Sequence, residues 1–135
     1  MDRKKLDAII AQVENYLECL KHFNEYMTLA RTNKFGQDHE AQFLELKAVL
    51  AQQLEIILAA FESTNIDREE ILRLLGAAPS LRLLSEHSEP KHRELENSWH
   101  KIFIEWQGFL GKLKVQQLQV EEPKSFWGSL FGKKG

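Results

Sequence analysis

Residues 6–30, LDAIIAQVENYLECLKHFNEYMTLA, hold the pattern that decides the fold. Large apolar residues recur there in alternating steps of three and four, the spacing that places side chains on one face of an α-helix. The stripe consists of Leu6, Ile9, Val13, Tyr16, Leu20, Phe23, Met27 and Ala30. Ile10 and Leu17 widen it, so we expect a helix from about Arg3 to Thr32 that contacts more than one neighbour.

A second apolar stripe follows a predicted break at residues 33–36. It consists of Phe43, Leu46, Leu50, Leu54, Ile57, Leu58 and Phe61, again at helical spacing. Asp38 is the expected N-cap, because its carboxylate can accept hydrogen bonds from the first backbone N–H groups. We expect this helix to end at residues 63–65. The short link predicts that the first two helices lie antiparallel.

Residues 66–88 do not continue these long stripes and predict a compact connection made of short helices. Asp67 and Glu70 have the spacing of a capping box, which starts the first of them. Gly76 is expected to end that helix in a left-handed conformation. Pro79 is expected in the first turn of the next one.

A last long helix is predicted to begin at Ser88 and Pro90. Its stripe consists of Leu95, Trp99, Phe103, Trp106, Leu110 and Leu113, and we expect the two tryptophans to be core residues. Gly108 and Gly111 indicate a close backbone approach, a bend, or an exposed face that tolerates glycine. The prediction is an all-α, elongated antiparallel bundle of three long helices over residues 1–120, with the helical connection at about 66–88. A separate C-terminal amphipathic segment spans residues 121–135.

Composition limits the classes of partner. The chain has 135 residues, which fits one domain, with 18 basic and 20 acidic residues and a net charge of −2. That balance argues against nucleic acid as a partner. The N-terminus runs into an amphipathic pattern without a signal-peptide block, and no apolar run is long enough to span a bilayer. We therefore expect a cytoplasmic protein, one that can also dock at the inner face of a membrane.

Few residues have the spacing that chemistry needs. Three Glu–His pairs fall within one helical turn: Glu18–His22, Glu89–His92 and Glu96–His100. A di-iron bundle needs two Glu-x-x-His motifs and two further glutamates, so solvent-facing ion pairs are the favoured interpretation. Cys19 is the only cysteine, and nothing around it indicates a depressed thiol pKa. We expect no enzyme, no cofactor and no metal site.

The C-terminal segment is the predicted binding site. Glu121, Glu122 and Pro123 break the last helix, and KSFWGSLFGKKG follows. As a helix it places four large apolar side chains within an arc of about 140°, at 100° per residue, with lysines on both sides. The candidate residues are Lys124, Phe126, Trp127, Leu130, Phe131, Lys133 and Lys134. An anionic membrane surface or an apolar groove on a protein partner would satisfy this pattern. Packing of the aromatic residues onto the chain's own bundle is the alternative.

The leading functional hypothesis is a non-catalytic helical adaptor or scaffold that docks through this segment. Two long helices, a leucine-rich link and a third long helix give the chain a layout that resembles small helical export chaperones of the flagellar and type III secretion class. That resemblance covers most of the chain and implies an alternative, a protein that binds a client on exposed helix faces. A metal-binding helical protein is the third hypothesis. The wide apolar stripes make a homodimer plausible.

Overall fold

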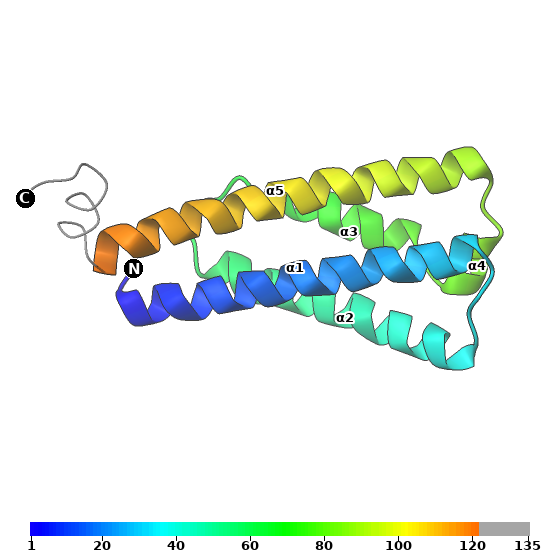
Figure 1. Cartoon of the computed structure of the whole chain (residues 1–135), viewed down its shortest axis with the longest axis horizontal. Helices are drawn as coiled ribbons and strands as arrows, with labels where there is room; N and C mark the ends of the chain where they lie inside the picture. Colours follow the sequence, from blue (N-terminus) through cyan, green and yellow to red (C-terminus); the bar gives the residue numbers. More distant parts are fainter. Residues whose placement is uncertain (122–135) are drawn as a thin grey trace, which may run out of the picture.

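The computed structural model describes residues 1–121, which contain five helices and no strand. These are α1 (Arg3–Arg31), α2 (Gln37–Ala59), α3 (Arg68–Ala77), α4 (Leu81–Ser85) and α5 (Glu89–Glu121). The three long helices run along an elongated molecule (Figure 1). The predicted all-α bundle of three long helices with a short helical connection is confirmed.

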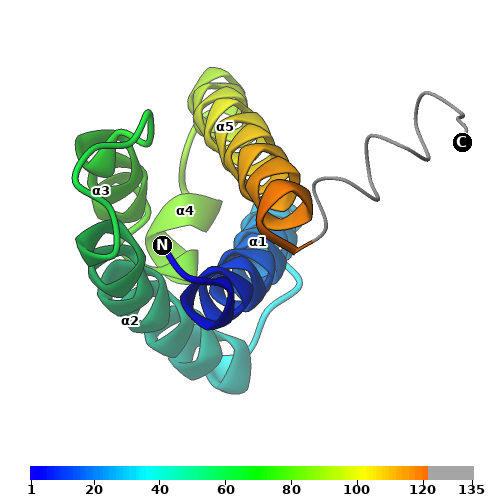
Figure 2. The ribbon, with the colours of Figure 1, turned by 90° about the vertical axis from the view of Figure 1, so that its left-hand side faces the viewer.

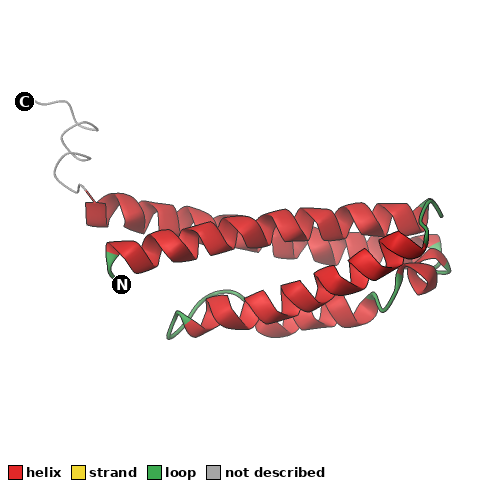
Figure 3. Ribbon diagram, turned by 90° about the horizontal axis from the view of Figure 1, so that it is seen from below, coloured by secondary structure: helices red, strands yellow, loops and turns green. Residues whose placement is uncertain are grey.

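Helix α1 is the centre of the packing, because it contacts α2, α4 and α5. Helix α3 contacts α2 and α5 on the side away from α1, and α4 lies among the long helices in the end-on view (Figure 2). Seen from below, α1 and α5 run side by side along the molecule, whereas α2 slants away from them toward one end (Figure 3). The wide stripe on α1 therefore serves several neighbours, as its width predicts.

The core follows the predicted stripes. Nine residues of α1 are buried: Leu6, Ile10, Val13, Tyr16, Leu17, Leu20, Phe23, Met27 and Ala30. Tyr16 joins three helices, because its ring stacks on Trp106 of α5 at 4.2 Å between centroids and its hydroxyl donates to the Leu50 carbonyl of α2 at 2.8 Å. Without that acceptor, a buried hydroxyl would cost about 1–3 kcal/mol.

Both predicted core tryptophans pack against α1. Trp106 is fully buried, with 1% of its surface exposed. Trp99 is half-buried and stacks on Phe103 at 4.9 Å between centroids. Its indole N–H donates to the Leu20 carbonyl of α1 at 2.7 Å, so the seam between α1 and α5 carries a specific hydrogen bond as well as apolar contact.

The start of α2 differs from the prediction. Asn33 takes the left-handed conformation (φ 59°) in the predicted break, but the N-cap of α2 is Gly36 and not Asp38. The Gly36 backbone N–H donates to His39 Nδ1 at 3.0 Å, so the imidazole supplies the acceptor for the backbone N–H of the N-cap residue. Asp38 lies inside the first turn, where its negative charge still favours the helix dipole. The helix also ends earlier than predicted, with Ala60 as its C-cap.

The predicted capping box at α3 is half confirmed. Asp67 accepts a hydrogen bond from the Glu69 backbone N–H at 3.0 Å. Glu70 does not return to the cap, because its carboxylate pairs with Lys101 of α5 at 2.6 Å. A tertiary ion pair thus replaces a local hydrogen bond.

Two predictions about the connection are wrong. Gly76 does not end α3, which continues to Ala77, with Ala78 as the C-cap at φ −123°. Pro79 lies outside α4, whose N-cap is Ser80; its hydroxyl accepts from the Leu83 N–H at 3.1 Å. Ala78 and Ser80 both have negative φ, so no left-handed glycine is needed at either place.

Candidate functional site

The predicted binding residues lie outside the described part of the chain: Lys124, Phe126, Trp127, Leu130, Phe131, Lys133 and Lys134. Their roles and the division at residues 120–121 stay predictions. Helix α5 is described through Glu121, which comes shortly before these residues in the sequence. The surroundings of that helix end are therefore the first place to look for a site.

Exposed apolar side chains gather toward this end. Val115, Leu118 and Val120 on the last turns of α5 are each about half exposed. The start of α1 lies beside them, because Gln117 Nε2 donates to Asp7 Oδ1 at 2.8 Å across the antiparallel pair. Figure 1 shows the N-terminus next to the end of α5. Met1, also exposed, adds to the apolar surface here.

Part of this surface belongs to a second stripe on α5 that turns away from the core. At 100° per residue its members fall within an arc of about 80°, opposite the buried Trp106 and Leu113. They are Ile104, Gly108, Gly111, Val115 and Leu118. Apart from the adjoining residues and the backbone of α5 itself, no described atom lies within 4 Å of a Cβ built on either glycine. The close approach that the glycines suggested is not made by the described chain, and the exposed-face alternative holds.

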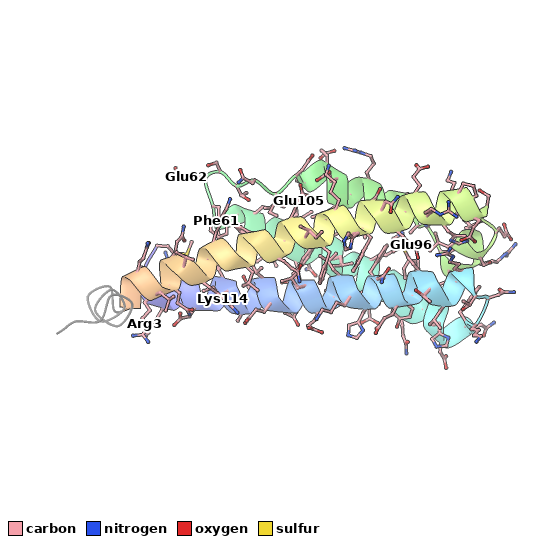
Figure 4. All side chains as sticks on the ribbon, turned by 45° about the horizontal axis from the view of Figure 1, so that its top comes forward. Arg3, Phe61, Glu62, Glu96, Glu105 and Lys114 are labelled. Atoms are coloured by element: carbon pink, nitrogen blue, oxygen red, sulfur yellow. The ribbon has the colours of Figure 1, made fainter. Side chains whose placement is uncertain are left out.

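A hollow of about 510 Å³ lies between the α2–α3 connection and α5. Its lining includes the apolar Phe61, Ile66 and Phe109 and the charged Glu105 and Lys112. Phe61 and Glu105 are labelled in Figure 4 and come from the two sides of the hollow. Polar side chains of the connection, among them Ser63 and Thr64, also line it, so the hollow is mixed in character.

Two carboxyl groups beside this hollow interact. The pKa of Glu105 is raised, first by burial and then by a hydrogen bond to Glu70 and its charge. The pKa of Glu70 is lowered, chiefly because Lys101 donates to it. A carboxyl pair of this kind is often catalytic, but Lys101 already satisfies one member and an ion-pair network explains the shifts.

A shallower hollow of about 660 Å³ follows the seam between α1 and α5. Leu17 and Leu110 line it, with Gly111 on the α5 side. Glu14 and Lys114 bridge it at 3.4 Å. This hollow continues the outer surface of α5 onto α1.

The histidines do not form the predicted ion pairs. His22 lies 2.9 Å from Glu25 and not against Glu18, which pairs with Lys21. Both Glu89 and Glu96 pair with Arg31 of α1, the latter at 2.8 Å. Long-range pairing with Arg31 has replaced the two pairs predicted on α5, and other local pairs have replaced the one on α1.

His92 also corrects the prediction, because it is buried and not solvent-facing. Its ring lies 5.8 Å from that of His87, and burial, followed by Lys91 and His92, lowers the pKa of His87. Two imidazoles alone do not make a transition-metal site. Within residues 1–121 no three His, Cys, Asp or Glu side chains are grouped so that they could hold a metal.

Cys19 is half-buried at the edge of the core. Burial, and then the Glu18 charge, raise the pKa of its thiol, which agrees with the prediction that nothing activates it.

One basic cluster was not predicted from the sequence. The first turn of α1 contains Arg3, Lys4 and Lys5 and no acid, and all three are exposed. Arg3 and Lys114 lie toward the same end of the molecule (Figure 4). The signal was visible, since a helix normally begins with acidic residues. Its place beside the end of α5 was not.

A scan against protein-family models found no matching family, and searches of curated proteins and solved structures found no match. No helix in the described region combines the length and the apolar character needed to cross a bilayer. Any function must therefore be argued from the surfaces above.

Proposed function

We propose that the chain is a non-catalytic helical adaptor that docks to a membrane surface or a protein partner through its C-terminal amphipathic segment. The observation that carries this proposal is the position of Val115 and Leu118, whose exposed side chains share one face of α5 shortly before that segment in the sequence. The apolar surface of the helix and the aromatic residues that follow it in the sequence then form one continuous docking element.

The energetics explain why the segment needs that continuation. Burying its four large apolar side chains contributes roughly 6–10 kcal/mol, and three lysines near an anionic surface add about 3 kcal/mol. Ordering about eight residues costs on the order of 8–12 kcal/mol, so little remains. Apolar side chains on a helix that is already folded add contact without that cost.

A matched pair of leucines tests this contribution. Leu118 and Leu83 are both 46% exposed, but Leu83 lies on α4 at the other end of the bundle. We expect Leu118→Ala to weaken docking about 3–10-fold, as partial loss of one buried leucine requires, and Leu83→Ala to leave it unchanged. Trp127→Ala should weaken docking at least as much.

Docking is measured by sedimentation with vesicles and by pull-down of protein partners, using the full chain. Equal effects of the two leucine variants would contradict the continuous docking element. If removal of residues 123–135 lowers the melting temperature by several degrees, the aromatic residues belong to the core, and the adaptor proposal is wrong.

The outer stripe of α5 favours a second candidate, a chaperone-like protein that holds a client on exposed helix faces. Ile104, about half exposed and far from the end of α5, is the residue that an adaptor does not explain. A client bound in this way would remain bound after residues 123–135 are removed. If the deletion of residues 123–135 abolishes binding, the chaperone-like candidate is excluded and the adaptor remains.

A further inference from the structure

The first turn of α1 has the wrong charge for a helix start. The exposed N–H groups there carry a partial positive charge, which favours Asp or Glu and disfavours cations. Asp2 does cap the helix, accepting from the Lys5 N–H at 2.8 Å, but Arg3, Lys4 and Lys5 follow it without an acid. The Lys4 and Lys5 side chains form no ion pair with any described residue. Folding therefore gives no reason for these two lysines.

The antiparallel packing of α1 and α5 brings this turn to the end of α5, which precedes the predicted docking segment in the sequence. Asp7 and Gln117 are hydrogen-bonded, so the first turn of α1 lies beside the last turn of α5 (Figures 1 and 3). Within the described chain, residues 1–7 and 111–121 together hold five Lys or Arg and three Asp or Glu, a net charge of +2. Residues 8–110 hold ten Lys or Arg and sixteen Asp or Glu, a net charge of −6. The molecule has one basic end.

We infer that this end is a second contact of the docking site and that its partner is an anionic lipid bilayer. The inference rests on the proposed function and names the partner of the same site. Lys4 and Lys5 stand on a folded helix, so they meet a negative surface without the ordering cost of the C-terminal segment. The exposed Leu118 and Val115 beside them suit the headgroup boundary, where apolar side chains insert. The negative charge on the rest of the chain turns that part away from the bilayer.

The test compares two double substitutions in the full chain. Lys4→Gln with Lys5→Gln removes the proposed contact. Lys34→Gln with Lys91→Gln is the matched control, since both lysines are exposed at the opposite end of the bundle and the change in net charge is the same. Binding is measured by sedimentation with phosphatidylcholine vesicles that contain phosphatidylserine, and with phosphatidylcholine alone.

We expect Lys4→Gln with Lys5→Gln to weaken binding to the anionic vesicles about 30-fold, because each lysine near such a surface contributes about fivefold. The control should change it less than twofold, and pure phosphatidylcholine should bind neither. The melting temperature of the Lys4/Lys5 variant should not fall, because two cations leave a helix start. A purely structural role for the lysines predicts the opposite.

Three results would overturn the inference. Equal binding of the two double variants would show that the α1 turn is not a contact, while Trp127→Ala still tests the proposed function. No binding of the unsubstituted chain to anionic vesicles, with a protein partner still captured through Trp127, would exclude the bilayer but keep the adaptor. A clear drop in melting temperature on Lys4→Gln with Lys5→Gln would assign the lysines to the fold.

Discussion

Glu40→Gln tests whether one carboxylate of α2 holds the short helix α4 against the bundle. Glu40 Oε1 accepts a hydrogen bond from the Leu81 backbone N–H at 2.8 Å, and Oε2 accepts one from Arg82 at 3.2 Å. Both donors lie in the first turn of α4, where no intrahelical acceptor exists. The side chain caps a helix that begins 41 residues later in the sequence.

The expected loss follows from the two hydrogen bonds. A hydrogen bond to a charged group contributes about 1.5–3 kcal/mol, with the lower value for the exposed bond to Arg82. Glutamine keeps one acceptor and turns an NH₂ group toward the other donor. We expect the free energy of unfolding to fall by about 2–3 kcal/mol, which lowers the melting temperature of a chain this size by roughly 6–12 °C.

The assay is denaturant and thermal unfolding at pH 7, followed by circular dichroism. Glu45→Gln is the matched control, because Glu45 is an exposed glutamate on the same helix without a hydrogen bond or ion pair to any described residue. If the two variants differ by less than about 0.5 kcal/mol, apolar packing alone holds α4 and the capping argument is wrong.

Three further predictions follow. Leu20→Ala, which truncates a side chain 1% exposed, should cost about 2–5 kcal/mol in denaturant melts, and a loss below about 1 kcal/mol would contradict the packing. The raised pKa of Glu105 means that ionisation of this carboxyl group lowers the stability of the fold as pH rises. Glu105→Gln should therefore raise the melting temperature at pH 7, and this gain should disappear below the ordinary glutamate pKa of 4.5. An equal gain at both pH values would refute the carboxyl repulsion. The purified protein should contain no stoichiometric transition metal by elemental analysis, and one tightly held ion lost on replacing His92 or His100 would contradict this.

Only part of the candidate site could be predicted from the sequence. The aromatic and lysine pattern of the C-terminal segment is a local property, so composition and spacing could single it out. The outer stripe of α5 has the same spacing as the inner one. Which of the two faces the core depends on α1, since Trp106 stacks on Tyr16 while Val115 meets no partner helix. Spacing alone does not rank two stripes on one helix.

The sequence by itself determined the helices and most of the core, because a repeat of three and four residues forces one face of α1 to be apolar whatever surrounds it. Only the tertiary structure decided the polar partners. Asp38 and Gly76 lost their predicted capping roles, and Glu96 pairs with Arg31 of α1, 65 residues away. The hydrogen bond between Asp7 of α1 and Gln117 near the end of α5 is of the same kind. Charged and hydrogen-bonding side chains pair with the groups that the packing places near them. Local spacing in the sequence therefore does not predict partners that are distant in the chain.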